Sequence, residues 1–128
     1  MKVYIVAIAL LAAISCSRDP QVEYNRTQGQ VTSNTFTYVP RAGQVNTMDI
    51  KFSLENSCSI FDSFESHRDG DTLIIKVWGL TPKDVGCTKE IRYHTKPFKY
   101  AFPAPGTYYL KFARNNGLWH RDTVTVLP

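Results

Sequence analysis

The feature that most constrains this chain is an alternation of apolar and polar residues with a period of two, which runs from Val31 to Val126. Successive side chains of a β-strand point to opposite faces, so this alternation predicts strands with one buried and one exposed face. The rows predicted to face the core are Met48, Ile50, Phe52 and Leu54; Leu73, Ile75 and Val77; Phe98, Tyr100 and Phe102; Tyr108, Leu110 and Phe112; and Val124 and Val126.

Turn-forming residues separate the alternating segments, as in Asp69-Gly70-Asp71, Pro105-Gly106 and Asn115-Asn116-Gly117. The spacing predicts strands near residues 34–39, 46–54, 60–65, 72–78, 89–93, 97–102, 107–113 and 118–126. Seven or eight short strands over about 100 residues are typical of a β-sandwich. We therefore expect an all-β chain with a single antiparallel sandwich over residues 31–128.

Residues 105–112 and the Thr-Val-Thr-Val segment that follows the next turn resemble the closing hairpin of many bacterial immunoglobulin-like domains. Together with residues 56–61 and 86–88, they are similar to a group of small uncharacterised lipoproteins of the Gram-negative outer membrane. The resemblance covers most of residues 31–128 and implies an immunoglobulin-like sandwich. Folds of this kind serve adhesion, carbohydrate binding, chaperoning and plain spacing, so the resemblance implies no single function.

The first sixteen residues have the pattern of an export signal. Lys2 precedes twelve consecutive apolar residues, 3–14, which is the length of a signal-peptide core and too short for a membrane span. Residues 13–16, Ala-Ile-Ser-Cys, resemble the lipobox of bacterial lipoproteins, in which the cysteine is acylated and becomes the new N-terminus. We expect a signal peptide over residues 1–15 and a lipid, such as palmitate, on Cys16; the alternative is an ordinary cleavage site that leaves Cys16 unmodified.

The chain has three cysteines, and an exported protein seldom keeps an odd one free. If Cys16 carries lipid, Cys58 and Cys87 remain as a pair, and a bond between them closes a loop of about 30 residues. The alternative is two unpaired buried thiols.

Residues 16–30 are predicted to form the lipidated cysteine and a polar, flexible tether. Ser17 follows the cysteine in place of the Asp that retains many lipoproteins in the inner membrane. By that resemblance we expect an exported chain held at the outer membrane by its lipid; a soluble secreted or periplasmic protein is the alternative.

No catalytic or metal site can be assembled from the sequence. His67, His94 and His120 are isolated, and none stands at a spacing that places two metal ligands on one face. The sequence has no Gly-rich phosphate loop and no nucleophile elbow. The formal charge is +4, and its basic residues are scattered among acidic ones, which disfavours nucleic acid as a partner. We expect no enzyme activity and no cofactor.

Binding is indicated by one group of side chains on the last hairpin. If its loop is residues 115–117, Leu118 lies on the buried face with the valines of the last strand, while Tyr109, Lys111, Trp119 and Arg121 share the opposite face. Aromatic and guanidinium groups together can stack on a sugar ring or anchor a protein contact. The alternative is an ordinary surface, or one covered by another segment.

These observations favour a non-catalytic, membrane-anchored module that offers a binding or structural surface in the cell envelope, with an envelope protein or a glycan as partner. The alternatives are a carbohydrate-binding module that uses Trp119 and Tyr109, and a small inhibitor of an exported hydrolase that presents a loop near residues 58–64 or 79–87.

Overall fold

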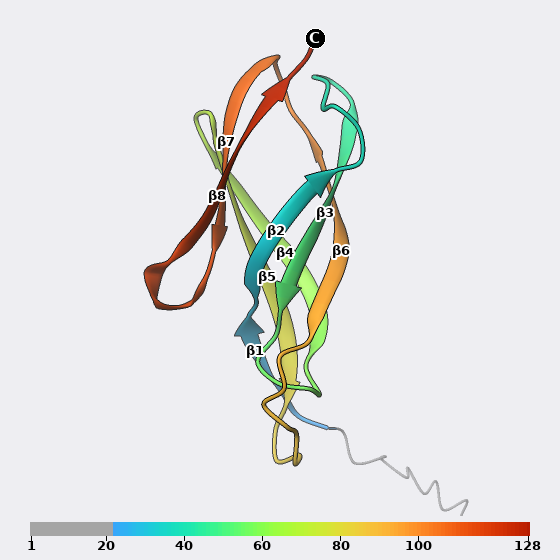
Figure 1. Ribbon diagram of the computed structural model, residues 1–128, viewed down its shortest axis with the longest axis vertical. Helices are drawn as coiled ribbons and strands as arrows, with labels where there is room; N and C mark the ends of the chain where they lie inside the picture. Colours follow the sequence, from blue (N-terminus) through green and yellow to red (C-terminus); the bar gives the residue numbers. More distant parts are fainter. Residues whose placement is uncertain (1–21) are drawn as a thin grey trace, which may run out of the picture.

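The computed structural model describes residues 22–128, in which eight strands form two facing sheets (Figure 1). The strands are β1 (Tyr24–Gln28), β2 (Gln30–Phe36), β3 (Val45–Ser53), β4 (Ile60–Asp69), β5 (Thr72–Pro82), β6 (Tyr93–Ala101), β7 (Gly106–Ala113) and β8 (Trp119–Val126). This arrangement confirms the predicted fold class, an all-β sandwich of seven or eight strands. Among residues 22–128, no helix is long and apolar enough to cross a membrane.

The larger sheet has five strands and is organised around β5. Strand β4 pairs along one edge of β5, while the other edge is shared by β1, next to residues 78–82, and β7, next to residues 72–75. Strand β8 pairs with β7 and completes the sheet. The smaller sheet has the order β2-β3-β6. All pairings are antiparallel except that of β5 with β7, which is parallel because the chain crosses to the smaller sheet through β6 between them.

The core lies between the sheets and is made by the predicted apolar rows. The members of these rows on β3, β5, β7 and β8 are buried, and so are Phe98 and Phe102, while Tyr100 is partly buried. Val31 of β2 joins them, fully buried. The period-two pattern therefore predicts which face of each of these strands is covered.

The β4–β5 hairpin has the tight turn that its sequence predicts. Asp69 pairs with Thr72, so the loop is two residues long, and Gly70 has φ 60° at its first position. A two-residue loop of this geometry favours glycine there because a side chain would be strained at positive φ.

The predicted tether over residues 16–30 is wrong in its second half, because the sandwich begins at Tyr24 and not at Val31. Strand β1 pairs with β5 from Tyr24, opposite Pro82, to Gln28, opposite Trp78. Its polar sequence has no alternation, and it is held by backbone pairing and by a hydrogen bond between the hydroxyls of Thr27 and Thr81, 3.0 Å apart. The predicted signal peptide, Cys16 and residues 17–21 lie outside the described residues.

The strand predicted over residues 89–93 is also wrong. Residues 83–92 form a loop, and only Tyr93 of the predicted segment belongs to a strand, where it begins β6. The loop is tied to the β3–β4 connection by the disulfide between Cys58 and Cys87, which confirms the predicted pair. The Ser57 amide also donates to the Thr88 carbonyl over 3.0 Å. These ties replace the strand pairing that the sequence pattern predicts.

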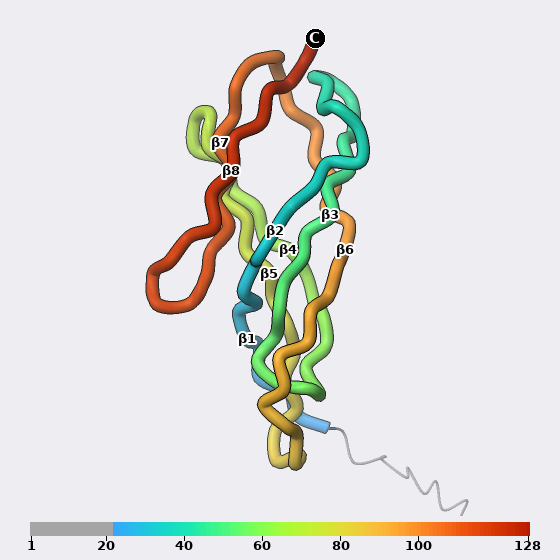
Figure 2. Tube along the Cα trace, viewed as in Figure 1, coloured from blue at the N-terminus to red at the C-terminus, as the bar shows by residue number. Residues whose placement is uncertain are grey.

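The two ends of the sandwich differ in what they contain (Figures 1 and 2). One end holds the start of β1 and the loops at residues 54–59 and 83–92, and we call it the β1 end. The opposite end holds the loop at residues 37–44, the β6–β7 connection and the C-terminal residue. A chain that continues towards the N-terminus therefore leaves the domain at the β1 end.

The β7–β8 hairpin departs from prediction at one residue. Its loop is a short turn over Asn115–Gly117, with Gly117 at φ 70°, as predicted. Leu118, predicted to be buried, is instead exposed. Leu118 pairs with Arg114 through its backbone at the end of the turn, and the tip of the hairpin swings clear of the smaller sheet, so nothing covers its side chain (Figure 1).

Candidate functional site: the outer face of the five-stranded sheet

The four side chains singled out on the last hairpin lie together on the outer face of the larger sheet. Lys111 of β7 is paired with Arg121 of β8, and Trp119 is paired with Ala113, one step further along the same face. Tyr109 lies on that face as well, opposite Thr123. Tyr109 is 48% exposed and Trp119 is 37% exposed, so within the described residues no other segment covers them fully.

Trp119 is held in place by its neighbour on β7. The Lys111 Nζ lies 5.2 Å from the centre of the Trp119 ring, a distance at which a cation is attracted to the face of an indole. This contact orients the ring along the sheet and fixes one positive charge beside it. The pairing of β7 with β8 therefore places the Lys111 cation against the ring of Trp119.

The outer face extends further than the last hairpin. Because β7 runs parallel to β5, Lys111 is in register with Ile74, and Ile74 is in turn in register with His67 of β4. The next row of the face pairs Glu65 with Lys76. Side chains from β4, β5, β7 and β8 thus form one continuous surface. We call its central residues the outer-face site: His67, Ile74, Lys76, Tyr109, Lys111, Trp119 and Arg121.

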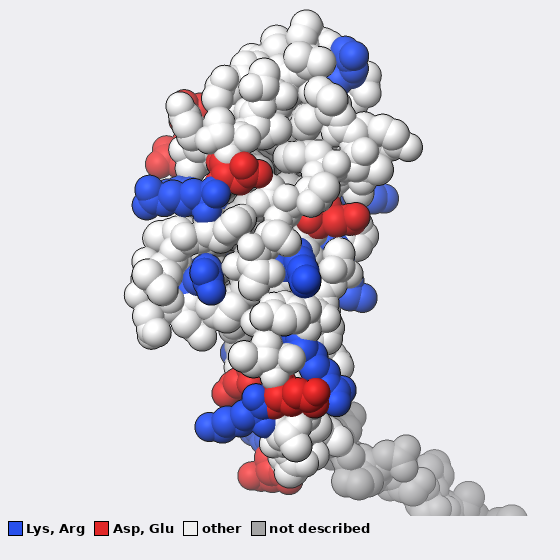
Figure 3. All heavy atoms as spheres, in the orientation of Figure 1, with Lys and Arg blue, Asp and Glu red and all other residues white. Residues whose placement is uncertain are grey.

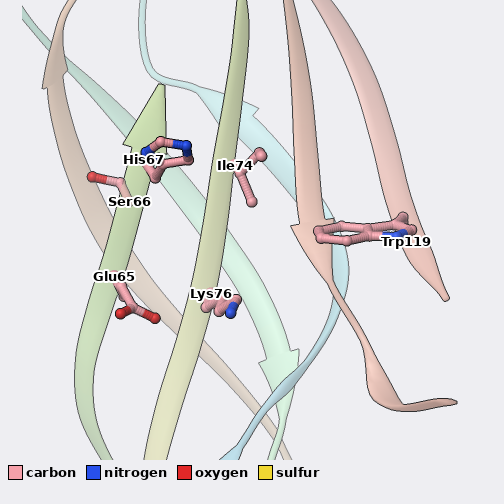
Figure 4. A pocket seen from close by; sticks show the side chains of 6 residues that line it. All are labelled: Glu65, Ser66, His67, Ile74, Lys76 and Trp119. Atoms are coloured by element: carbon pink, nitrogen blue, oxygen red, sulfur yellow. The ribbon is translucent and has the colours of Figure 1, made fainter. Parts of the chain in front are cut away.

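A shallow depression of about 380 Å³ lies within this surface (Figure 4). It is lined by Glu65, Ser66, His67, Ile74, Lys76 and Trp119. In Figure 4 the ring of His67 lies towards Ile74 while Ser66 points to the other side of β4, and Trp119 closes the depression from β8. A second depression of about 290 Å³ is lined by side chains that include Thr72, Tyr109, Lys111, Arg121 and Thr123, and it adjoins the first along β7 and β8.

Within the described part of the chain, the cations of the outer-face site have no carboxylate at ion-pair distance. Three ion pairs occur among residues 22–128, and none of them includes Lys76, Lys111 or Arg121. The nearby acidic groups are engaged elsewhere. Glu65 accepts a hydrogen bond from the Trp78 indole over 3.1 Å, and Asp122 accepts one from Asn34 over 2.6 Å. Three positive side chains are therefore available to a ligand.

Trp78 lies on the same outer face but nearer the β1 end, where its neighbours come from β1 and β4. The guanidinium carbon of Arg26 lies 4.1 Å from the centre of its ring, and Arg26 also lies 3.7 Å from Asp62. Strand β1, which the sequence analysis assigned to a tether, thus covers this tryptophan. Trp78 is half-buried and is not part of the outer-face site.

The three histidines lie in separate environments. His67 is in the outer-face site, His94 stacks against Phe52 with ring centres 5.7 Å apart, and His120 is 3.1 Å from the Asn34 side-chain oxygen. Among the described residues, no group of three or more His, Cys, Asp or Glu side chains is placed to hold a metal ion.

The segments considered as inhibitory loops are mainly strands. Residues 60–64 belong to β4 and residues 79–82 belong to β5, and only residues 58–59 and 83–87 of these segments are loop. The exposed loop that remains begins at residue 83 and is tied to the β3–β4 connection by the disulfide.

Sequence reasoning missed His67, Ile74 and Lys76. The alternation within β5 does place Ile74 and Lys76 opposite the core row, so their outward direction is predictable. Their proximity to Trp119 is not, because it depends on the parallel pairing of β5 with β7, strands separated by all of β6.

The strands that build this face also carry the similarity of the chain to known proteins. The sequence model of the ORF11 beta-sandwich domain family matches residues 48–126. The chain belongs to the ORF11 beta-sandwich domain family. The matched span of the ORF11 domain begins in β3 and ends with β8, so it contains every residue of the outer-face site. Comparison with curated proteins and with solved structures gives no match.

Proposed function

We propose that this ORF11 domain is a non-catalytic lipoprotein of the cell envelope, anchored to the outer membrane through Cys16, whose outer-face site binds another envelope component. The observation that carries the proposal is the unpaired cluster of Lys76, Lys111 and Arg121 around the partly exposed Trp119. Charges near the surface contribute little to folding even when they form ion pairs, so stability does not account for this cluster.

The composition of this surface suits a binding contact. Aromatic and Arg side chains are enriched where proteins contact their ligands because they offer a large contact area and lose little conformational freedom. Trp119, Tyr109 and Arg121 supply those groups on a rigid sheet, which holds them at fixed positions before a ligand arrives.

The disulfide supports the exported location. Bonds between cysteines form and persist in oxidising compartments outside the cytoplasm. Because Cys58 and Cys87 are bonded to each other, Cys16 is the one cysteine of the chain left for another role. This leaves the lipobox-like position as the natural place for an acyl chain.

A carbohydrate is the second candidate ligand, favoured by the same surface. The rings of Trp119 and Tyr109 offer flat faces on which sugars stack, and the three cations beside them suit a sugar that carries acidic groups. A shallow depression open on one side admits an extended chain of sugars more readily than it encloses a small molecule.

The test of the proposal is crosslinking in living cells with the tagged, full-length chain. The wild type is compared with a Trp119→Ala, Arg121→Ala double variant and with a Tyr38→Ala control, because Tyr38 is exposed in the 37–44 loop, outside the outer-face site. We expect a specific envelope protein to be captured by the wild type and the control and lost from the double variant. Equal capture by all three forms would show that the partner binds elsewhere, and capture by none would leave carbohydrate as the ligand to test.

The anchor is tested separately by Cys16→Ala. We expect this variant to lose the acylated mass and to leave the membrane fraction. Unchanged fractionation would contradict anchoring through Cys16, whatever the crosslinking result.

A further inference from the structure

Exposed apolar side chains gather at the β1 end of the sandwich. They come from the start of β1, from the adjoining end of β4 and from the 83–92 loop and its continuation into β6. These residues are Val22, Tyr24, Ile60, Val85, Ile91 and Tyr93. Ile91 is the most exposed of them at 68%. Large apolar side chains grouped in this way at one end of a small domain indicate a surface that contacts something other than water.

This end is also where the chain leaves towards Cys16. Six peptide units separate Cys16 from Val22, and even fully extended they span only about 20 Å. The span is short because the sandwich begins at Tyr24 and not at Val31. A lipid on Cys16 therefore brings the β1 end close to the membrane that holds it, whatever path the connecting residues take.

Four charged side chains at this end form two ion pairs. Lys83 lies 3.7 Å from Glu23, and Arg92 lies 3.2 Å from Glu90. Blue and red side chains accordingly lie together at the lower end of the molecule in Figure 3. Paired charges of opposite sign partly cancel, which reduces the electrostatic repulsion between this end and anionic lipids. Repulsion of this kind therefore does little to oppose an apolar contact with the lipid.

Tyrosine and branched aliphatic side chains on short loops suit the boundary between lipid headgroups and acyl chains. Tyr is enriched at that depth because its ring is apolar and its hydroxyl remains hydrated. Tyr24 and Tyr93 have this character and are both exposed. The binding of such surfaces strengthens with the apolar area that they bury.

We infer that the β1 end docks on the lipid surface that carries the anchor, with Val85, Ile91 and Tyr93 in the headgroup region. The inference rests on the proposed lipidation of Cys16. In this orientation the long axis of the domain points away from the membrane. The outer-face site, which lies towards the middle of the sheet, then stays clear of the lipid (Figures 1 and 4). The exposed residues Tyr38, Val39 and Val45 lie at the opposite end and are held away from the same surface.

The inference is tested with the full-length lipidated chain in vesicles of phosphatidylethanolamine and phosphatidylglycerol. An environment-sensitive NBD probe is attached through Ile91→Cys, and in a matched control through Val39→Cys, which lies at the opposite end and is exposed to a similar degree. Both positions are exposed, so neither substitution disturbs the core. We expect a blue shift of the probe at residue 91 and quenching by nitroxide-labelled lipids, with neither effect at residue 39.

The outcomes separate this inference from the proposed function. A lipidated, vesicle-bound chain whose probe at residue 91 keeps its aqueous emission would overturn the docking inference and leave the anchor intact. A wild-type chain that is recovered from cell membranes without an acyl group on Cys16 would overturn the anchor, and the inference with it. Shielding of residue 91 in native envelopes but not in vesicles would identify a protein as the occupant of this end and would also overturn the lipid contact.

Discussion

The side-chain amide of Asn34 on β2 donates a hydrogen bond to the carboxylate of Asp122 on β8 over 2.6 Å, and so joins the two sheets of the sandwich. The same amide group places its oxygen 3.1 Å from His120 Nε2. All three side chains are half-buried on the inner side of the hairpin. A hydrogen-bonded group at this position replaces the apolar contact that the sandwich makes further along β8, at Val124 and Val126.

Replacing Asn34 with Ala is expected to destabilise the domain by about 1 to 3 kcal/mol, because it leaves the Asp122 carboxylate without its partner. The measurement is the free energy of unfolding in urea. Thr35→Ala is the control, because Thr35 lies next to it on β2 and is exposed. Equal unfolding free energies for the two variants would show that the connection between the sheets contributes nothing.

Gly79→Ala is expected to destabilise the domain by about 1 to 3 kcal/mol through overpacking. A Cβ at this position of β5 would lie 2.7 Å from Leu54 Cδ2 and 3.2 Å from the Ile60 carbonyl oxygen. The backbone of β4 approaches closely here, where the pairing register of β4 shifts between Phe61 and Ser63.

Thermal and urea unfolding of the Gly79 variant check this prediction, with Gly86→Ala as the control because a Cβ at Gly86 meets nothing within 4 Å. A stable Gly79→Ala protein would mean that Leu54 moves aside at no cost.

Loss of the Cys58–Cys87 disulfide is expected to cost about 3.5 kcal/mol, the chain-entropy value for a closed loop of this length. The comparison is between the oxidised domain and a Cys58→Ala, Cys87→Ala variant in urea unfolding. Peptide mapping without reductant identifies the pair in native material. Free alkylation of both thiols in native material would refute the bond, and an unchanged unfolding free energy would show that the 83–92 loop is held by its hydrogen bonds alone.

Titration with an oligosaccharide of galacturonic acid is expected to change the tryptophan fluorescence of the domain, because the proposed site surrounds Trp119 with three cations. The response should be lost in Trp119→Ala and should weaken as salt is added, since added salt screens the attraction between exposed charges. Urea unfolding of the Trp119→Ala variant checks that it remains folded, so that a lost response reports on binding.

A neutral galactose oligosaccharide of equal length serves as the comparison. An equal response to both sugars would contradict a role for Lys76, Lys111 and Arg121 in binding, and a response that persists without Trp119 would place the sugar elsewhere.

The core of this fold was predictable from local pattern, because each buried row on β3, β5, β7 and β8 repeats every second residue. The disulfide was predictable for a different reason. The chain has three cysteines, and if Cys16 carries lipid only Cys58 and Cys87 remain to pair. Leu118 shows where pattern fails. Alternation assigns it to the inner face, but the facing sheet does not extend that far.

The first strand and three residues of the candidate site, His67, Ile74 and Lys76, were not predictable in the same way. Strand β1 is polar apart from Tyr24 and exists because the edge of β5 offers backbone partners, which no property of residues 24–28 reveals. The outer-face site joins Lys76 to Trp119 through strands that are distant in the chain, so it depends on topology. Tyr109, Lys111, Trp119 and Arg121 were predictable as a group because a single hairpin brings them together.

Strand β6 forms an open edge of the smaller sheet, and Pro97 stands in its middle, opposite Asp49, with Lys96 and Lys99 close by. A proline has no amide hydrogen to offer to an added strand, and lysines at an edge repel a second copy that approaches in the same way. This edge is therefore closed to polymerisation. Copies of such a domain that crowd on one surface are therefore kept from joining their sheets through β6.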